Sequence, residues 1–266
     1  MTTTALSTRR DYLTAQRRTI IARALAASLA GTVPVPILDD WAVGAVLGGA
    51  YRRIAAAHHI DLDNDAVKSL VFGNARPTSI ADIAVGGIMM RIAGLAAKRM
   101  MLALTAVNRA RAASRNFVVM TLFDHYCARL HTGLALDGET ALALRDEIVK
   151  AIDNTPGALS FHPFRRGALS AARATLKAPL ELADLATRGA VRRLLSKKSE
   201  VTDAEVVDDV DRAVETALAS KTGFLSRTVT AVELQLSAEQ NPFIDRAIEN
   251  LDRRWRARLA ARGTVK

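Results

Sequence analysis

The sequence predicts an all-α protein, a multi-helix bundle that begins with a helical hairpin broken by proline. Half of the 266 residues are hydrophobic, so the chain can bury a sizeable core, whereas only 5% are aromatic. Alanine and leucine are abundant and favour helix, while strands draw on aromatic and β-branched residues. The sequence contains neither a convincing strand pattern nor an internal repeat, so helices should supply the fold.

The N-terminal hairpin is predicted from the residues that interrupt it. A first helix should run over residues 7–30 and end before Pro34-x-Pro36, because proline cannot continue a helix. A second helix should span residues 41–58, with Asp39 or Asp40 as its N-cap. A charged pair is costly at bilayer depth, so the turn should sit at a polar boundary and the hairpin should not span a membrane.

Two glycines lie on the second helix of the hairpin, one turn apart. Gly44 and Gly48 have no side chain, so we expect another helix to approach closely there. Further helices are expected at residues 65–72, 79–113, 115–131, 138–153, 168–195, 202–218 and 224–236 and from Pro242 onwards. A polar stretch at 196–199 indicates a main helical domain of residues 1–196 with a C-terminal helical extension, 197–266, packed on it, or one single domain.

Charge is distributed unevenly along the chain, whose formal net charge is +10. Residues 1–133 carry 16 Lys and Arg against 8 Asp and Glu, whereas residues 197–266 carry 12 against 12. Coincident basic and apolar excess is typical of a protein that lies on anionic lipid. The predicted lipid contacts are Arg9, Arg10, Arg17, Arg18, Arg52, Arg53, Lys98, Arg99, Phe161, Phe164, Arg165 and Arg166. For the two phenylalanines, the alternative is that they fill the core between helices.

The expected location is the cytoplasm, peripheral to the inner membrane. Cys127 is the one cysteine, which fits a reducing compartment. Arg17-Arg18 before an uncharged run imitates a twin-arginine export signal, but the apolar spacing of Leu13, Ile20 and Ala24 favours an ordinary helix. The uncharged stretches are also shorter than the ~18–20 residues that a spanning helix needs.

One helix face gathers residue types that could carry chemistry. Asp124, Cys127 and His131 share a face, and His125 lies beside them, so a transition-metal site or a Cys–His nucleophile is one interpretation. The alternative, which we favour, is packing and polar contacts between helices, with Cys127 as a packing residue. No metal or cofactor is expected.

Two motifs that imitate ligand sites fail on spacing. Lys221-Thr222-Gly223 lacks the upstream glycine of a phosphate-binding loop, which argues against nucleotide hydrolysis. Asp61-x-Asp63-x-Asp65 begins like a calcium loop, but Ala66 and Phe72 stand where glycine and glutamate are required. The acidic turn is therefore interpreted as a helix cap.

The hairpin resembles the EcsC family and the related YcjF-type bacterial domain. The resemblance rests on the Ala-rich helix, Val33-Pro34-Val35-Pro36-Ile37-Leu38-Asp39, and the Gly/Ala helix ending in Ile60-Asp61-Leu62-Asp63, within about residues 15–133. It implies a helical, membrane-associated bacterial protein. Some relatives are joined to a GTPase domain, so the resemblance also implies a GTPase as a possible protein partner.

The leading functional hypothesis is a non-enzymatic, peripheral membrane protein that binds an anionic lipid surface, a protein partner, or both. A second is a soluble helical adaptor without membrane contact, whose apolar hairpin is its core. A third, which we rank last, is a hydrolase built on Asp124, Cys127 and His131. Helix-turn-helix, zinc-finger and RNP-like patterns are missing from the sequence, so nucleic acid is not an expected partner.

Overall fold

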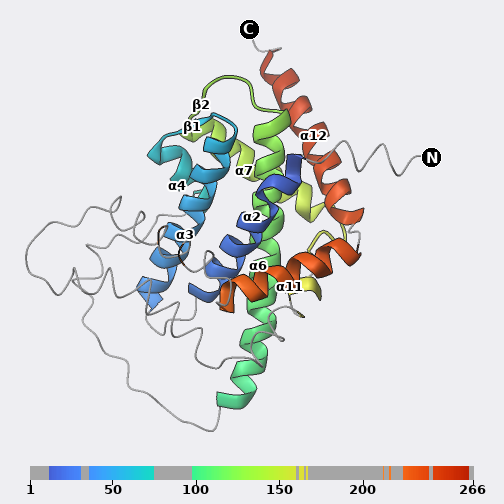
Figure 1. The fold of residues 1–266 in the computed structure, drawn as a ribbon. Helices are drawn as coiled ribbons and strands as arrows, with labels where there is room; N and C mark the ends of the chain where they lie inside the picture. Colours follow the sequence, from blue (N-terminus) through green and yellow to red (C-terminus); the bar gives the residue numbers. More distant parts are fainter. Residues whose placement is uncertain are drawn as a thin grey trace, which may run out of the picture.

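The computed structural model describes residues 12–30, 36–74, 98–159, 162–164, 166, 212, 216, 224–239 and 242–263. The fold is all-α, as the composition predicts (Figure 1). Its helices are α2 (Tyr12–Ala30), α3 (Pro36–Ala57), α4 (Asn64–Phe72), α6 (Lys98–Arg129), α7 (Gly138–Asp153), α11 (Phe224–Glu239) and α12 (Pro242–Gly263). Two short strands, β1 (Asp61–Leu62) and β2 (Ala135–Leu136), accompany them.

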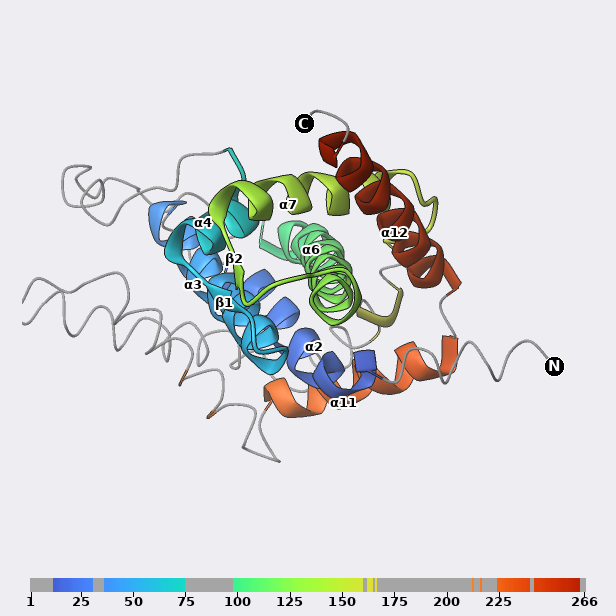
Figure 2. The same cartoon turned by 90° about the horizontal axis from the view of Figure 1, so that it is seen from above.

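Helix α6 is the axis of the bundle. Seen nearly end-on in Figure 2, it is surrounded by α2, α3, α4, α7 and α12. Its most extensive contacts are with α2, which in turn packs against α3 and α11, while α4 and α12 pack on α7. Segments from both ends of the chain therefore meet around one central helix.

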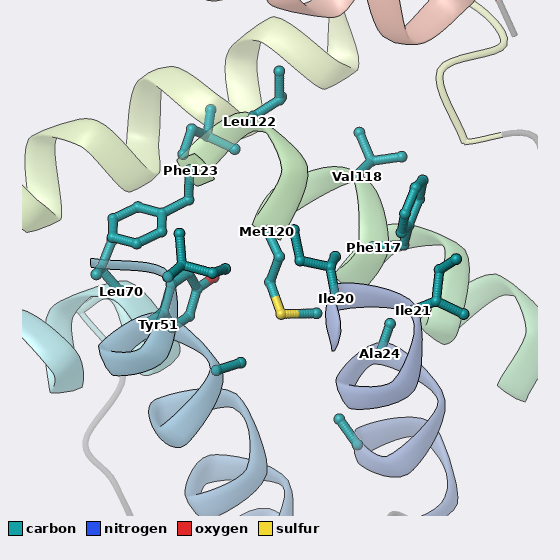
Figure 3. Close-up of a cluster of buried hydrophobic side chains, with 14 of the residues drawn as sticks. Ile20, Ile21, Ala24, Tyr51, Leu70, Phe117, Val118, Met120, Leu122 and Phe123 are labelled. Atoms are coloured by element: carbon teal, nitrogen blue, oxygen red, sulfur yellow. The ribbon is translucent and has the colours of Figure 1, made fainter. Parts of the chain in front are cut away.

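The hydrophobic core fills the space between α2, α3, α4 and α6 (Figure 3). Ile20 and Ile21 of α2 face Met120 and the neighbouring residues of α6, and Tyr51 of α3 meets Phe123 edge to face at 5.0 Å between ring centres. Alanines such as Ala24 allow the helix backbones to approach closely. The hairpin residues whose burial is described, within 12–28 and 43–57, thus contribute to the core.

The hairpin differs from the prediction at its turn and at its glycines. Helix α3 begins at Pro36, so Asp39 lies inside the helix and the prediction that it is the N-cap is wrong. Proline suits the first helical position, because the amide hydrogen it lacks has no partner there anyway. A Cβ on Gly44 would meet Phe72 of α4 at 2.6 Å, and one on Gly48 would meet Val67 at 3.1 Å, so these glycines admit α4. Pro34 lies outside the described residues.

Helix α6 is one continuous helix, where the sequence suggested two. The predicted break near residue 114 does not occur, because no glycine or proline lies between Lys98 and Arg129 and Ser114 is buried within the bundle. The predicted helix start at Ser79 and the predicted helices at 168–195 and 202–218 lie outside the described residues, apart from isolated positions. So does the predicted domain boundary at 196–197.

The short strands pair in parallel and were not predicted. Asp61 lies opposite Ala135 and Leu62 opposite Leu136, and the Asp61 amide donates to the Leu134 carbonyl at 2.7 Å. A strand of two residues is too short to show an alternation of apolar and polar residues in the sequence. The pairing accompanies the packing of α4 against α7.

Each strand leads into an aspartate that caps the next helix. Asp63 accepts from the Ala66 amide at 2.5 Å and Asp137 from the Thr140 amide at 2.8 Å. The failed calcium motif is therefore a cap, as the sequence indicated. No helix in the described part of the chain is long and apolar enough to cross a membrane.

Candidate functional site

The last two turns of α6 bring the predicted chemical residues into the middle of the bundle. Asp124 and His125 are consecutive, so their side chains leave the helix about 100° apart. Asp124 turns towards the end of α3, and His125 turns towards α2 and α12. The cluster predicted on one helix face is therefore divided between two separate sets of contacts.

Asp124 pairs with His58, which follows the last residue of α3. His58 Nε2 donates to Asp124 Oδ1 at 2.7 Å, and the carboxylate is fully buried while the His58 side chain is 20% exposed. Asp124 Oδ2 has no hydrogen-bond partner among the described residues. Burial raises the pKa of Asp124, and the hydrogen bond and charge of His58 offset part of that rise.

His125 lies between a phenol and a second carboxylate. Tyr12 Oη is 2.5 Å from His125 Nδ1, and His125 Nε2 is 2.7 Å from Asp252 Oδ1 on α12. A carboxylate only accepts, so Nε2 carries the imidazole proton and Nδ1 accepts from the Tyr12 hydroxyl. The Arg129 guanidinium lies over the Tyr12 ring, 4.8 Å from its centre.

This Tyr12–His125–Asp252 triad was missed at the sequence level. Tyr12 precedes His125 by 113 residues, and Asp252 follows it by 127. No spacing rule connects residues so far apart, and the order of helices around α6 is what brings them together. The one available signal was His125 itself, a polar residue within an apolar stretch of helix.

Cys127 and His131 do not form a nucleophile or a metal site with Asp124. Burial raises the pKa of the Cys127 thiol, and the nearby Asp124 carboxylate raises it further, which is the reverse of what a reactive thiolate requires. His131 Nδ1 instead meets the Tyr126 hydroxyl at 3.2 Å. Within the described residues no three His, Cys, Asp or Glu side chains are placed to hold a metal ion.

The predicted lipid contacts have different environments. Phe164 is buried against Phe117, with ring centres 5.4 Å apart, so the expectation that it enters lipid is wrong. Burial of an aromatic ring against another ring removes a large apolar surface from water, which favours this packing in the core. Arg166 is exposed and donates to Gln235 of α11 at 3.2 Å. Arg9, Arg10, Phe161 and Arg165 lie outside the described residues.

The predicted basic residues of α2 and α3 lie at the surface beside polar partners. Arg18 approaches Glu233 of α11 at 3.8 Å, and Arg52 donates to Asn64 at 2.7 Å. Arg17 is half-buried and Arg53 is exposed. Lys98 and Arg99 form the first turn of α6.

The N-terminal half of α6 is basic throughout. From residue 98 to residue 123 the helix contains no Asp or Glu, and it contains Lys98, Arg99, Arg109, Arg111 and Arg115. The side chains of Arg111 and Arg115 are exposed. Figure 1 shows this half of α6 extending beyond α2 and α11, away from the strand end of the bundle.

The opposite end of α6 is acidic. Five exposed carboxylates surround the two strands and the helix starts that follow them: Asp61, Asp63, Asp65, Asp137 and Glu139. Arg115 lies 14 residues before the end of α6 at Arg129, which is about 21 Å at 1.5 Å per residue. The described residues therefore form an acidic pole at the strands and a basic pole along residues 98–115 of α6.

Comparisons with known proteins give no match: no family model, no curated protein and no solved structure is similar to this chain.

Proposed function

We propose that this chain is a non-enzymatic, peripheral membrane protein that binds an anionic surface through residues 98–115 of α6. The observation that carries the proposal is this basic, acid-free segment with its exposed Arg111 and Arg115. Many apolar residues of the hairpin whose burial is described belong to the core, so the proposal places the contact on the basic segment of α6.

Helix electrostatics support the choice of this pole. The start of a helix carries a partial positive charge, and negative side chains normally occupy it. The first turn of α6 contains no acidic residue and instead contains Lys98 and Arg99. Two cationic residues do not offset the partial positive charge of a helix start and are unfavourable next to it. An anionic surface would offset both positive charges.

Vesicle flotation tests the proposal with a matched pair of double variants. The first, Arg111→Glu with Arg115→Glu, reverses two charges on α6. The control, Arg253→Glu with Arg256→Glu, makes the same change at exposed positions on α12. Each surface Lys or Arg near an anionic membrane contributes about 1 kcal/mol, so two reversals should weaken binding at least tenfold. The control carries the same change in net charge as the first variant, and it should bind within about twofold of the wild type.

The vesicles should contain anionic phosphatidylglycerol in one set and neutral phosphatidylcholine in the other. We expect binding only to the anionic vesicles, with release as salt is raised, because salt screens exposed charges. Equal loss in both double variants would mean that net charge alone drives adsorption, which contradicts a specific pole. Failure to bind either vesicle also rejects the proposal.

A second candidate function is a helical adaptor that binds a protein partner without membrane contact. The burial of the apolar hairpin favours it, because that hairpin is accounted for as core. A GTPase is the partner that the EcsC resemblance suggests. The adaptor is preferred if the protein fails to float with anionic vesicles, and co-purification that depends on Arg111 and Arg115 would then identify the same pole as a protein-binding surface.

A further inference from the structure

The triad of Tyr12, His125 and Asp252 has the connectivity of an activated nucleophile. A hydroxyl meets one nitrogen of an imidazole, and the other nitrogen meets a carboxylate, at 2.5 and 2.7 Å. That order of nucleophile, base and orienting carboxylate defines the nucleophilic triads of unrelated enzymes, in which the alcohol is usually serine. Here the alcohol is a phenol, whose ordinary pKa of about 10 already makes it more acidic than serine.

A cation lies beside the phenol of the triad. The Arg129 guanidinium lies over the Tyr12 ring, 4.8 Å from its centre, where it can offset negative charge that develops on the phenol oxygen during attack. Tyr12 and the Asp252 side chain are half-buried and reach the surface, whereas His125 is almost fully buried. The charged groups around the imidazole are Asp252 on α12, Arg129 on α6 and the neighbouring Asp124, which belongs to the His58 pair.

We infer that Tyr12 is a nucleophilic site that accepts a phosphoryl group from an activated phosphoryl donor. The exposed Arg129 selects this class of electrophile, because a guanidinium matches the oxygens of a phosphoryl group. In the reaction, the Tyr12 oxygen forms a bond to phosphorus and the bond from phosphorus to the leaving group breaks. The phenolic proton passes to His125 Nδ1, and the imidazolium that results is held by Asp252.

A fluorophosphonate probe tests this inference on the full chain at neutral pH. The probe carries phosphorus bound to fluoride, so attack by Tyr12 forms the O–P bond and releases fluoride. Mass spectrometry of peptides should place the label on Tyr12. Tyr51 and Tyr126 are internal controls, because burial raises the pKa of Tyr51 to about 12 and also raises that of Tyr126. We expect their labelling to be at least tenfold slower than that of Tyr12.

Three variants separate activation from simple exposure. His125→Ala should reduce labelling of Tyr12 at least tenfold through loss of the base. Asp252→Asn, which keeps a hydrogen-bonding side chain, should reduce it several-fold and serves if the alanine variant does not fold. Arg129→Gln should also reduce it, because the cation over the ring is removed.

The pH profile of the labelling rate provides a readout that a structural role would not change. An ordinary phenol reacts about tenfold faster per pH unit up to its pKa near 10. A phenol served by an imidazole base should reach a plateau well below that pKa, because the base and not solvent hydroxide removes the proton. Labelling confined to other residues, labelling that persists in His125→Ala, or a rate that rises steadily to pH 10 each overturns the inference.

Discussion

Asp124 is a buried carboxylate with a partner for one of its two oxygens. His58 satisfies Oδ1, while Oδ2 has no hydrogen-bond partner among the described residues. A buried charge of this kind costs stability unless it is fully paired. The residue belongs to the helix face that suggested chemistry in the sequence, but its environment makes it a polar contact between α3 and α6.

This environment leads to a pH-dependent prediction for Asp124→Asn. Because the pKa of Asp124 is raised in the folded state, the folded chain holds more protons than the unfolded chain just above the ordinary carboxyl range. The wild type therefore gains stability as the pH falls towards that raised pKa. Asparagine keeps an acceptor for His58 and carries no charge, so the variant should equal or exceed the wild type at pH 7.5, by on the order of 1 kcal/mol.

Urea unfolding of both proteins at pH 7.5 and pH 5 measures the effect. The advantage of the variant should shrink at pH 5, because the raised pKa of Asp124 brings protonation of the folded wild type closer to that pH. Asp252→Asn is a comparison at the more exposed carboxylate. A stability difference that is identical at both pH values would contradict the burial of a charged Asp124.

At the residue scale, sequence reasoning succeeded where the controlling partner lies nearby in the chain. The acidic turn at residues 61–65 was interpreted as a helix cap, and its Asp63 does cap α4, three residues ahead at Ala66, so the local pattern is sufficient there. The partners of His125 lie more than a hundred residues away in both directions. Local patterns carry no information on such contacts, because they depend on which helices become neighbours of α6.

At the scale of elements, the helices themselves were largely predictable and their boundaries less so. The amphipathic pattern gave α7 at residues 138–153, in agreement with the structure. The start of α3 was misplaced because Pro36 can begin a helix as well as end one. The small-residue pattern of Gly44 and Gly48 correctly indicated a close approach, although the approaching helix is α4.

The close approach of α4 to α3 is tested by Gly48→Leu. A Cβ at this position already lies 3.1 Å from Val67 Cγ1, so a leucine side chain should press against Val67 of α4. Overpacking should destabilise the fold by about 1–3 kcal/mol. Ala56→Leu, at an exposed position on the same helix, adds a large side chain without a clash and should change little.

A thermal melt of both proteins decides the matter. A variant at Gly48 that melts with the wild type would show that α4 can move away from α3 without cost. Asp39→Ala should not show the loss of about 1 kcal/mol typical of a removed N-cap, because Asp39 lies within α3.

At the scale of the whole molecule, the last helix is fixed to the bundle by polar contacts as well as by apolar ones. Trp255 of α12 meets Tyr126 of α6 edge to face at 5.0 Å between ring centres. Beside it, Glu147 of α7 is almost fully buried and accepts from Arg254 Nε at 2.7 Å, with Arg258 at 3.4 Å. Two arginines of the arginine-rich helix α12 therefore hold a buried carboxylate.

Replacing Glu147 with alanine should therefore loosen the attachment of α12. Removing one partner of a buried pair leaves the two arginines without their acceptor, at a cost of about 3 kcal/mol, somewhat reduced here because both arginines are partly exposed. Glu139→Ala is the matched control. Glu139 also lies on α7 and pairs with Arg262 of α12, but its side chain is 83% exposed. Such a surface pair contributes about 0–1 kcal/mol.

Hydrogen exchange followed by mass spectrometry distinguishes local from global loss. In Glu147→Ala, we expect amide protection to fall first in α12 and in the part of α7 that it covers, because those helices share the broken contact. Protection in α2 and α3 should fall only as far as the global stability falls. Since Asp252 lies on α12 and orients His125, the same variant should also slow phosphoryl labelling of Tyr12. Unchanged protection of α12 would mean that the Trp255 contact alone holds the helix in place.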